Sequence, residues 1–254
     1  MRKILFLIPH PDDEVVGCCS IIRKFNKNGK QIYLFFITNG VLSEKSSWVW
    51  DKKKIKSRVK SRKKEMKAVL KLLKIKDYFF QNIPTRTLKD NIPATLKRIK
   101  KIINLKRIDT IFCPAYEGGH QDHDVLNFIS SKFLNRYKIY EFAEYNYFNR
   151  KINVNSFIKN IKGQKILELS KEEILFKEKC LEIYKSERKN LSYIKVFKEC
   201  YRPLINYDYS KPPHKGILFY RRYSFFSWHP RVDKDKPQDI CNKFLKFEEH
   251  LNKI

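Results

Sequence analysis

Short apolar runs alternate with longer amphipathic stretches along the first 150 residues of the chain. The runs are the predicted strands, and most are typical of strands buried on both faces: residues 4–8, 31–37, 77–80, 110–113 and 138–142. The stretches carry apolar residues at helical spacing and are the predicted helices: residues 13–29, 52–74, 91–104 and 123–135. This alternation predicts an α/β fold, with a Rossmann-like, mostly parallel sheet flanked by helices.

The pattern becomes less regular after about residue 150. Residues 170–186 form a predicted helix, in which Ser170 is the N-cap and Glu173 completes a capping box. The segment 201–254 is rich in Tyr, Phe, Lys and Pro, so we expect a less regular C-terminal extension. The length of 254 residues fits one large α/β domain, and we predict that residues 1–254 form it.

Composition and charge narrow the class of protein. With 42% hydrophobic and 14% aromatic residues, the chain is globular rather than disordered. Its net charge of +28 favours anionic partners: phospholipid surfaces, phosphorylated glycans or nucleic acid. Because lysine is spread along the whole chain, we assign most of this charge to a general lysine bias. Weak peripheral contact with an anionic membrane is the expectation that remains.

The cysteines and the N-terminal residues indicate a cytoplasmic protein. None of the six cysteines belongs to a CxxC pair, which is typical of reduced core thiols rather than of disulfides or a cysteine zinc site. The apolar run 4–8 ends at Pro9, whereas a signal peptide needs about 7–15 apolar residues. No later stretch approaches the roughly 20 apolar residues of a membrane span.

Two polar clusters directly follow predicted strands. The first is His10–Pro11–Asp12–Asp13–Glu14, after strand 4–8. Imidazole and carboxylate groups are suitable zinc ligands, and His10 and Asp13 can converge because the loop turns into a helix between them. Acidic residues also suit the N-terminus of a helix, which accounts for the acids but not for His10.

The second cluster, residues 118–124, follows strand 110–113 and reads Gly-Gly-His-Gln-Asp-His-Asp. It fits either a metal site or a polar loop that caps a helix and carries surface histidines. Three of the six histidines lie in the two clusters, and the other three are assigned to surface or packing positions. Ligands of parallel sheets bind beyond the carboxyl ends of the strands, so adjacent strands would bring the two clusters together.

These motifs together resemble the PIG-L/LmbE family of de-N-acetylases. The specific matches are Pro-His-Pro-Asp-Asp-Glu at 9–14 and Gly-His-Gln-Asp-His at 119–123. Weaker matches are Thr-Asn-Gly at 38–40, the Arg-x-x-Glu helix at 62–65, and the late helix at 177–186. In the last region Cys180, Tyr184 and Glu187 depart from the family pattern. The resemblance covers roughly residues 2–190.

The resemblance implies one zinc ion per chain, or another first-row divalent metal. Its ligands would be His10, Asp13 and His123. Zinc lowers the pKa of water to about 7 and polarises an amide carbonyl. The implied activity is the hydrolysis of the acetamide of an N-acetylated amino sugar, of the N-acetylglucosamine glycoconjugate type, to acetate and a free amine.

The resemblance also implies the catalytic residues. Asp12 matches the general base, and Arg62 resembles a substrate-contacting arginine. His120 matches the residue that stabilises the charged transition state or protonates the leaving amine, and Asp122 matches the acid that orients His120 and keeps it charged. In some family members a tyrosine assists the oxyanion just before the second motif. Here that position is Gly118, so the role is not assigned.

The expected substrate is a small-molecule or lipid-linked amino sugar. We expect substrate choice to depend on residues 43–51, with Trp48 and Trp50, and on the aromatic segment 201–230. Tryptophans stack on sugar rings, although ordinary packing is an equally good interpretation. The sequence makes no prediction of oligomeric state.

Three alternatives stay open. A metal-dependent phosphoesterase would use similar side chains but often needs two metals and more ligands than this chain offers. A basic module that binds nucleic acid or anionic lipid finds its best support in residues 52–76, although no nucleic-acid-binding signature appears and no specific nucleic acid is expected. An inactive hydrolase is disfavoured because Asp12, His120 and all three ligands are retained.

Overall fold

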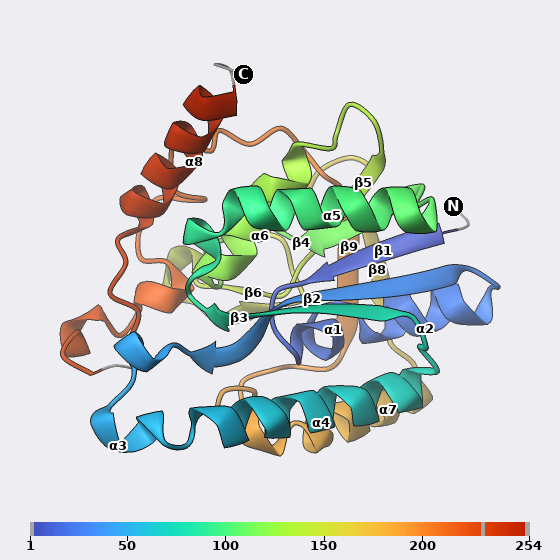
Figure 1. Ribbon diagram of the computed structural model, residues 1–254. Coiled ribbons are helices and arrows are strands. Elements are labelled where there is room, and N and C mark those ends of the chain that lie inside the picture. The colour runs from blue at the N-terminus through green and yellow to red at the C-terminus, as the bar shows by residue number, and fades with distance from the viewer. Residues whose placement is uncertain (1–2, 230–231, 252–254) are drawn as a thin grey trace.

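A single seven-stranded sheet runs through the protein, in the order β3-β2-β1-β4-β5-β9-β8 (Figure 1). The computed structural model describes residues 3–229 and 232–251. The strands of the sheet are β1 (Lys3–Ile8), β2 (Gln31–Leu42), β3 (Tyr78–Thr85), β4 (Thr110–Pro114), β5 (Lys138–Phe142), β8 (Lys165–Glu168) and β9 (Lys198–Pro203). Strands β1 to β5 are parallel, whereas β9 pairs antiparallel with β5 and β8. The predicted Rossmann-like α/β fold is confirmed.

Helices cover both faces of this sheet (Figure 1). The helices packed on one face are α5 (Ile92–Lys106), α6 (Gln121–Ser131) and α8 (Pro237–Leu251). The helices on the other face are α1 (Asp13–Val16), α2 (Cys19–Lys27), α4 (Ile55–Leu73) and α7 (Lys171–Ile183). The short elements outside these layers are α3 (Val49–Lys52) and a separate hairpin of β6 (Tyr145–Asn146) and β7 (Asn153–Val154).

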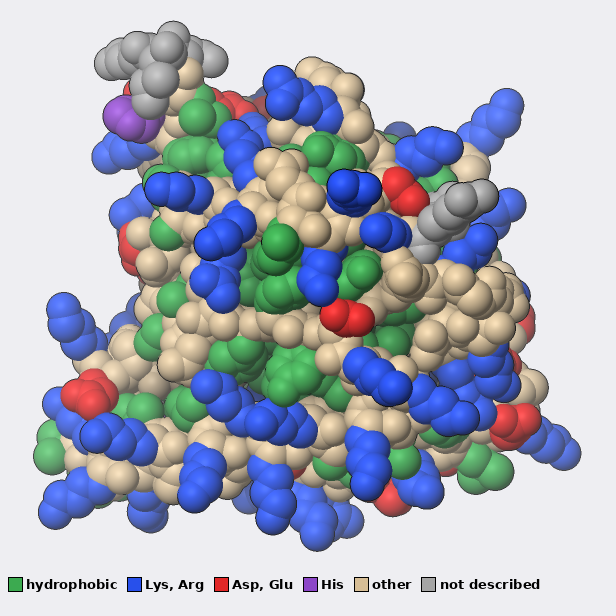
Figure 2. Space-filling view, turned by 45° about the vertical axis from the view of Figure 1, so that its right-hand side comes forward, with side chains coloured by type: hydrophobic (Ala, Val, Ile, Leu, Met, Phe, Trp, Pro, Cys, Tyr) green, Lys and Arg blue, Asp and Glu red, His purple; other side chains and the backbone are tan. Residues whose placement is uncertain are grey.

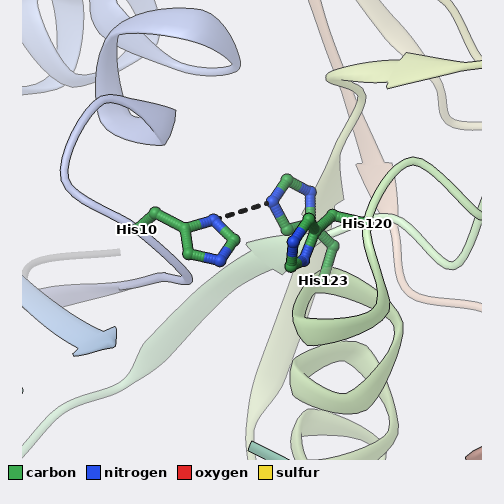
Figure 3. Close-up of side chains that lie close together, drawn as sticks. All are labelled: His10, His120 and His123. Carbon is green, nitrogen blue, oxygen red and sulfur yellow. Dashed lines mark hydrogen bonds between the residues drawn. The ribbon is translucent and has the colours of Figure 1, made fainter. Parts of the chain in front are cut away.

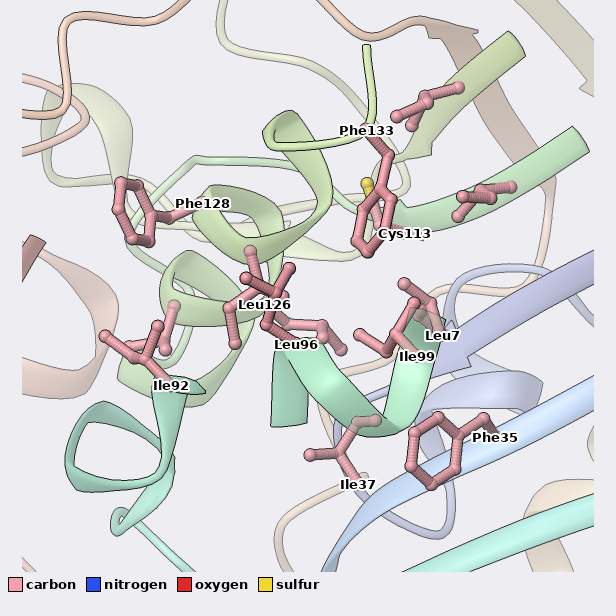
Figure 4. Close-up of a cluster of buried hydrophobic side chains, with 14 of the residues drawn as sticks. Leu7, Phe35, Ile37, Ile92, Leu96, Ile99, Cys113, Leu126, Phe128 and Phe133 are labelled. Atoms are coloured by element: carbon pink, nitrogen blue, oxygen red, sulfur yellow. The ribbon is translucent and has the colours of Figure 1, made fainter. Parts of the chain in front are cut away.

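Alternate residues of the central strands point into two separate cores. Leu5 and Leu7 of β1 pack with α5 and α6, and Figure 4 shows Leu7 facing Leu96 and Ile99. Ile4 and Phe6 point the other way, toward α2 and α4. Burial on both faces is why β1 is apolar at every position from 4 to 8, since each such side chain contributes roughly 1.5–3 kcal/mol when it leaves water.

Two predicted boundaries differ from the structure. The helix expected over 13–29 is two helices, because the first-turn amides of α2 are bound by a carboxylate from β9: Ser20 and Ile21 donate to Glu199. The strand predicted to end at residue 37 is longer, because β2 continues through Thr-Asn-Gly at 38–40 to Leu42. Its register against β3 shifts along this part.

The C-terminal part is more regular than expected. Within 201–254, β9 ends at Pro203 and α8 covers 237–251, where Phe244 stacks on Phe128 with ring centroids 4.3 Å apart. The described residues between them run as loops and single turns of 3-10 helix, as an irregular extension requires. The capping box of Ser170 and Glu173 is present at the start of α7. That residues 1–254 form one domain stays a prediction, and residues 1–2, 230–231 and 252–254 lie outside the described residues.

The positive charge is dispersed on the face that Figure 2 shows. Lys and Arg side chains cover this face with hydrophobic side chains between them, and no block of one kind dominates it. This distribution agrees with a general lysine bias. None of the helices in the described residues is long and apolar enough to cross a membrane.

Candidate metal centre and active site

The two sequence clusters meet at the carboxyl ends of β1 and β4. These strands are hydrogen-bonded neighbours, so the loop after β1 and the loop after β4 emerge side by side. His10 lies in the first loop, Asp13 begins α1, and His123 lies in the first turn of α6. Figure 3 shows the rings of His10, His120 and His123 converging from these two elements.

Three ligand atoms lie at mutual distances that suit one metal ion. The Nδ1 atom of His10 lies 2.8 Å from Oδ2 of Asp13 and 3.3 Å from Nε2 of His123, and the last two atoms are 3.2 Å apart. Ligand atoms about 2.0–2.1 Å from a tetrahedral zinc ion are about 3.3 Å from one another. The side chains of the predicted ligands His10, Asp13 and His123 therefore lie close enough together to share one ion.

The remaining nitrogen of each histidine faces a buried carboxylate. Nε2 of His10 lies 3.0 Å from Oδ2 of Asp122, and Nδ1 of His123 lies 3.4 Å from Oε2 of Glu144. Histidines that bind metals usually have such a partner, which fixes the ring and raises its basicity. Asp122 is itself held by Thr85, whose hydroxyl donates to Oδ2 at 2.9 Å, and by the backbone N–H of Arg86 at 2.7 Å.

The charge of this cluster fits a cation. The two groups of potential ligands that the described residues contain overlap at His123: one adds His10 and His120, the other Asp13 and Glu144. Both carboxylate oxygens of Glu144 are buried without a hydrogen bond, and burial followed by repulsion from Asp13 raises the pKa of Glu144 well above its usual range. A divalent cation would relieve this repulsion.

His10 and Asp13 hold complementary charges. Burial acts to lower the pKa of His10, but Asp13 and Asp122 outweigh it and raise that pKa to about 10. Burial acts to raise the pKa of Asp13, but His123 and His10 outweigh it and hold that pKa well below its usual range. Asp13 is thus present as the carboxylate, the form that binds a metal.

Asp12 stands beside the ligands in a strained backbone conformation. Its φ of 128° is rare for a residue with a side chain, and such a conformation costs about 1–3 kcal/mol. Burial raises the pKa of Asp12 well above its usual range, and the guanidinium of Arg62 opposes this effect. Two nitrogens of Arg62 lie 3.4 Å from the same Asp12 oxygen.

The placement of Arg62 differs from that of a substrate-contacting residue. Its side chain is buried between Asp12 and Glu187, whose Oε1 atom lies 3.5 Å from Nη1 of Arg62. It also fills the space beside Gly40, where an added Cβ would lie 2.7 Å from Nη2 of Arg62. Arg62 contacts the predicted base and is enclosed by the protein.

His120 and Asp122 also differ from the sequence expectation. Nδ1 of His120 accepts the backbone N–H of Asp122 at 3.0 Å and so caps α6. The carboxylate of Asp122 is nearer to His10 than to His120, which is 3.7 Å away. Burial and the neighbouring His10 lower the pKa of His120 well below its usual range, so Asp122 does not keep His120 charged. In this arrangement Asp122 orients His10.

Sequence reasoning missed several residues of this site. Thr85 ends β3, while Glu144 and Tyr145 follow β5. The centroid of the Tyr145 ring is 5.6 Å from that of His123, whereas Tyr116, the tyrosine nearest the second motif, donates to the carbonyl of Lys211 instead. The sequence signal that could have identified these residues is their position, because polar residues at the carboxyl end of any strand of this sheet face the same edge.

The two segments expected to govern substrate choice lie together. Trp48 stacks on Trp50 at 4.8 Å, and Trp48 also contacts His229 at 6.2 Å between ring centroids. Residues 43–51 and His229 of segment 201–230 therefore meet, although about 180 residues separate them in sequence.

The parallel sheet and its strand-end cluster of histidines and carboxylates are typical of a metal-dependent hydrolase, and the family match identifies it as an amidohydrolase. More specifically, the chain belongs to the PIG-L family, described as GlcNAc-PI de-N-acetylase, whose model matches residues 5–134. The match includes both motifs.

Solved structures share the fold at low sequence identity. The zinc-inhibited form of the teicoplanin deacetylase Orf2 is 14% identical, with a TM-score of 0.61 and coverage of 81% of this chain and 99% of that one. The N,N'-diacetylchitobiose deacetylase from Pyrococcus horikoshii is 18% identical, with a TM-score of 0.56 and coverage of 84% of both chains. GalB, the 4-carboxy-2-hydroxymuconate hydratase from Pseudomonas putida, is 12% identical, with a TM-score of 0.58 and coverage of 82% of this chain and 98% of that one. A fold shared by deacetylases and a hydratase does not by itself determine the reaction.

Proposed function

We propose that this protein is a zinc-dependent de-N-acetylase that hydrolyses the acetamide of an N-acetylated amino sugar to acetate and a free amine. The observation that carries the proposal is the convergence of His10 Nδ1, Asp13 Oδ2 and His123 Nε2 within 3.3 Å of one another, with Asp12 adjacent. Membership of the PIG-L family supports the same reaction. His10, Asp13 and His123 would hold one zinc ion per chain.

Asp12 is the proposed general base. When bound, zinc supplies a Lewis acid and lowers the pKa of water to about 7. Asp12 accepts a proton as a water oxygen bonds to the carbonyl carbon, and it returns that proton to the nitrogen as the C–N bond breaks. Burial raises the pKa of Asp12, and a carboxylate with a raised pKa is a stronger acceptor for the proton of the water.

His120 is the proposed partner of the oxyanion. Because Nδ1 of His120 accepts the backbone N–H of Asp122, the neutral ring carries its proton on Nε2. We propose that this N–H donates to the oxygen that gains charge during the reaction, or to the leaving nitrogen. Arg62 acts on Asp12, and Asp122 and Glu144 orient the two histidine ligands.

The proposed substrate class is a small-molecule or lipid-linked amino sugar. The deacetylases that share the fold act, by their names, on teicoplanin and on diacetylchitobiose. We further propose a cytoplasmic location, which six buried cysteines without a disulfide support.

Peripheral contact with an anionic membrane belongs to the same proposal. Phe225, Trp228 and Trp50 are 89%, 67% and 66% exposed, and Lys52–Lys54 follow Trp50 after Asp51. Exposed aromatic residues beside lysines are typical of surfaces that bind anionic lipid. Cosedimentation with phosphatidylglycerol but not with phosphatidylcholine vesicles, lost in the Trp50→Ala and Trp228→Ala double variant, is the expected result. Equal binding by both proteins would exclude this surface.

Acetate release from a panel of N-acetylhexosamine conjugates tests the function. We expect release that a chelator abolishes and that zinc restores, with a metal-to-protein ratio near one. Asp12→Asn should lower kcat at least 100-fold with the metal retained, and His123→Ala should lose the metal. The matched control is Asp77→Asn, which removes an exposed carboxylate at the opposite edge of the sheet and should keep wild-type activity. Release that is indifferent to chelator, or its absence across the panel, would overturn the proposal.

A further inference from the structure

The segment that follows Leu218 is attached to the loop that carries the second motif. The backbone N–H of Phe219 donates to the carbonyl of Gly118 at 2.9 Å. Leu218 lies so close that a Cβ added to Gly118, whose φ is +68°, would be 2.7 Å from it. This contact places a C-terminal segment, which shows no motif of its own, at the metal centre.

Aromatic rings extend from the metal ligand His123 toward this segment. Tyr145 follows His123 with ring centroids 5.6 Å apart, and Phe219 lies 4.6 Å from Tyr145. Tyr193 lies 5.7 Å from Tyr145 and 5.2 Å from Phe219, so three rings form one continuous cluster. Phe219 is buried, whereas Tyr145 and Tyr193 are partly exposed, so these two rings can offer apolar surface to a sugar ring beside a hydrolytic centre.

Arg222 lies at the outer end of this ring cluster. The guanidinium carbon of Arg222 is 3.5 Å from the ring centroid of Phe219, 4.8 Å from that of Tyr223 and 5.7 Å from that of Tyr193. Stacking on aromatic faces fixes a guanidinium in place and leaves its edge N–H groups free to donate.

The guanidinium of Arg222 has no acidic partner within residues 3–229 and 232–251. No carboxylate there lies within 4.0 Å, and its Nε atom is buried without a hydrogen bond. The buried arginines Arg62 and Arg202 differ, because each pairs with a carboxylate. A positioned arginine with an unsatisfied buried donor is a binding site for an anion that the protein does not itself supply.

The charges of the metal centre and of Arg222 both act on Tyr193. Burial raises the pKa of the Tyr193 hydroxyl, Arg222 opposes this effect, and Asp12, Asp13 and Glu144 add to it. Tyr193 therefore lies within electrostatic range of the carboxylates of the metal centre and of Arg222, whose guanidinium carbon is 5.7 Å from its ring centroid. A substrate that reaches both places would present its neutral acetamide to the first and a negative group to the second.

We propose that Arg222 binds an oxyanion, a phosphate or a carboxylate, attached to the amino-sugar substrate, while the sugar ring lies against Tyr145 and Tyr193. This inference rests on the proposed de-N-acetylase function and names its substrate class. The planar guanidinium matches the two oxygens of either anion. The net charge of +28 assists by attracting an anionic substrate to the protein.

Discrimination between anionic and neutral substrates tests the inference. The measurement is kcat/KM for acetate release from three substrates. N-acetylglucosamine 1-phosphate carries a phosphate, N-acetylmuramic acid carries a carboxylate, and the methyl glycoside of N-acetylglucosamine is neutral. We expect the wild type to prefer at least one anionic substrate, and the ratio of anionic to neutral kcat/KM to fall roughly 10- to 100-fold in Arg222→Gln. The anionic substrate for which this ratio falls identifies the anion that Arg222 binds.

The matched control is Arg136→Gln, which removes one charge from an exposed residue outside the site. It should keep the wild-type ratio, because its effect is limited to net charge. A ratio that is the same in Arg222→Gln as in the wild type would overturn the inference, as would an equal fall in both variants.

A second measurement separates this inference from the proposed function. Glucose 1-phosphate has no acetamide, so calorimetric titration of the metal-loaded protein with it measures binding independently of acetate release, and the comparison of variants isolates the contribution of Arg222. Weaker binding by Arg222→Gln than by the wild type and Arg136→Gln supports the site even if no conjugate releases acetate. Equal binding by all three proteins contradicts it even if acetate is released.

Discussion

The carboxylate of Glu14 accepts the backbone N–H of Asp12 at 2.9 Å, and so holds Asp12 in its left-handed conformation. Glu14 is fully buried, and its other oxygen accepts the hydroxyl of Tyr184 from the end of α7. Tyr184 is one of the positions at which this chain departs from the family motif. The proposed base is therefore positioned by a glutamate two residues later and by a tyrosine about 170 residues later.

Tyr184→Phe should lower kcat about tenfold with little change in KM. Without the hydroxyl, Glu14 loses a buried hydrogen bond and no longer holds Asp12 firmly, while the ligands of the metal stay in place. The measurement is steady-state kinetics together with metal content. A variant that lost metal and activity in parallel would show that Tyr184 supports the metal centre as a whole rather than Asp12.

Asp122→Asn and Glu144→Gln should each weaken metal binding about 10- to 100-fold. Each carboxylate faces the nitrogen of a histidine ligand that the metal does not use, and such partners fix the orientation of the ring. Competition with a chromogenic chelator measures the affinity, with Asp77→Asn as the control for the loss of one carboxylate. Wild-type affinity in Glu144→Gln would remove Glu144 from the metal centre.

The sequence predicted the strands, and it brought the proposed ligands to one place, because the signals for both are local. A strand buried on both faces must be apolar at nearly every position, so the predictions for 4–8 and 110–113 agree to within one residue with β1 and β4. His10 and Asp13 lie in one short motif, and His123 lies in the other. Their meeting required only that β1 and β4 be neighbours.

The contacts that tune the site could not be predicted in the same way. Glu144 and Arg222 have no motif around them, and their roles depend on packing against His123 and Phe219 from distant parts of the chain. The interruption between α1 and α2 depends on Glu199, which lies about 180 residues away in sequence. Periodicity carries no signal for such long-range hydrogen bonds.

Glu117 should make the stability of the protein fall as pH rises. Burial raises the pKa of Glu117 from 4.5 to about 7, and the backbone N–H of Ile158 and the amide of Asn146 offset only part of this rise. Between pH 4.5 and pH 7 the folded state binds more protons at Glu117 than the unfolded state does, so its contribution to the free energy of unfolding decreases there. At 1.36 kcal/mol per pH unit the change is up to about 3 kcal/mol.

The comparison of wild type with Glu117→Gln isolates this effect. Urea unfolding of both proteins between pH 4.5 and pH 8 gives the difference in their free energies of unfolding, from which shared effects of pH cancel. The wild type should lose stability relative to the variant as pH rises. A difference that is constant with pH, or that changes in the opposite direction, would mean that Glu117 keeps an ordinary pKa in the folded protein.

Lys177 should be one of the most sensitive positions for stability, although it lies outside the proposed chemistry. Its Nζ atom is fully buried, donates to the carbonyl of Val16 at 2.9 Å and pairs with Glu199 at 2.8 Å, and Glu199 binds the first-turn amides of α2. Lys177→Met leaves Glu199 buried without its cation and should cost about 3–5 kcal/mol. Lys179→Met, two residues later on the exposed side of α7, should change stability by less than about 0.5 kcal/mol. Because Val16 ends α1, the helix that Asp13 begins, metal affinity should also fall in Lys177→Met. If unfolding in urea gave the same midpoint for both variants, the buried pair would not be what fixes α1 and α2 to β9.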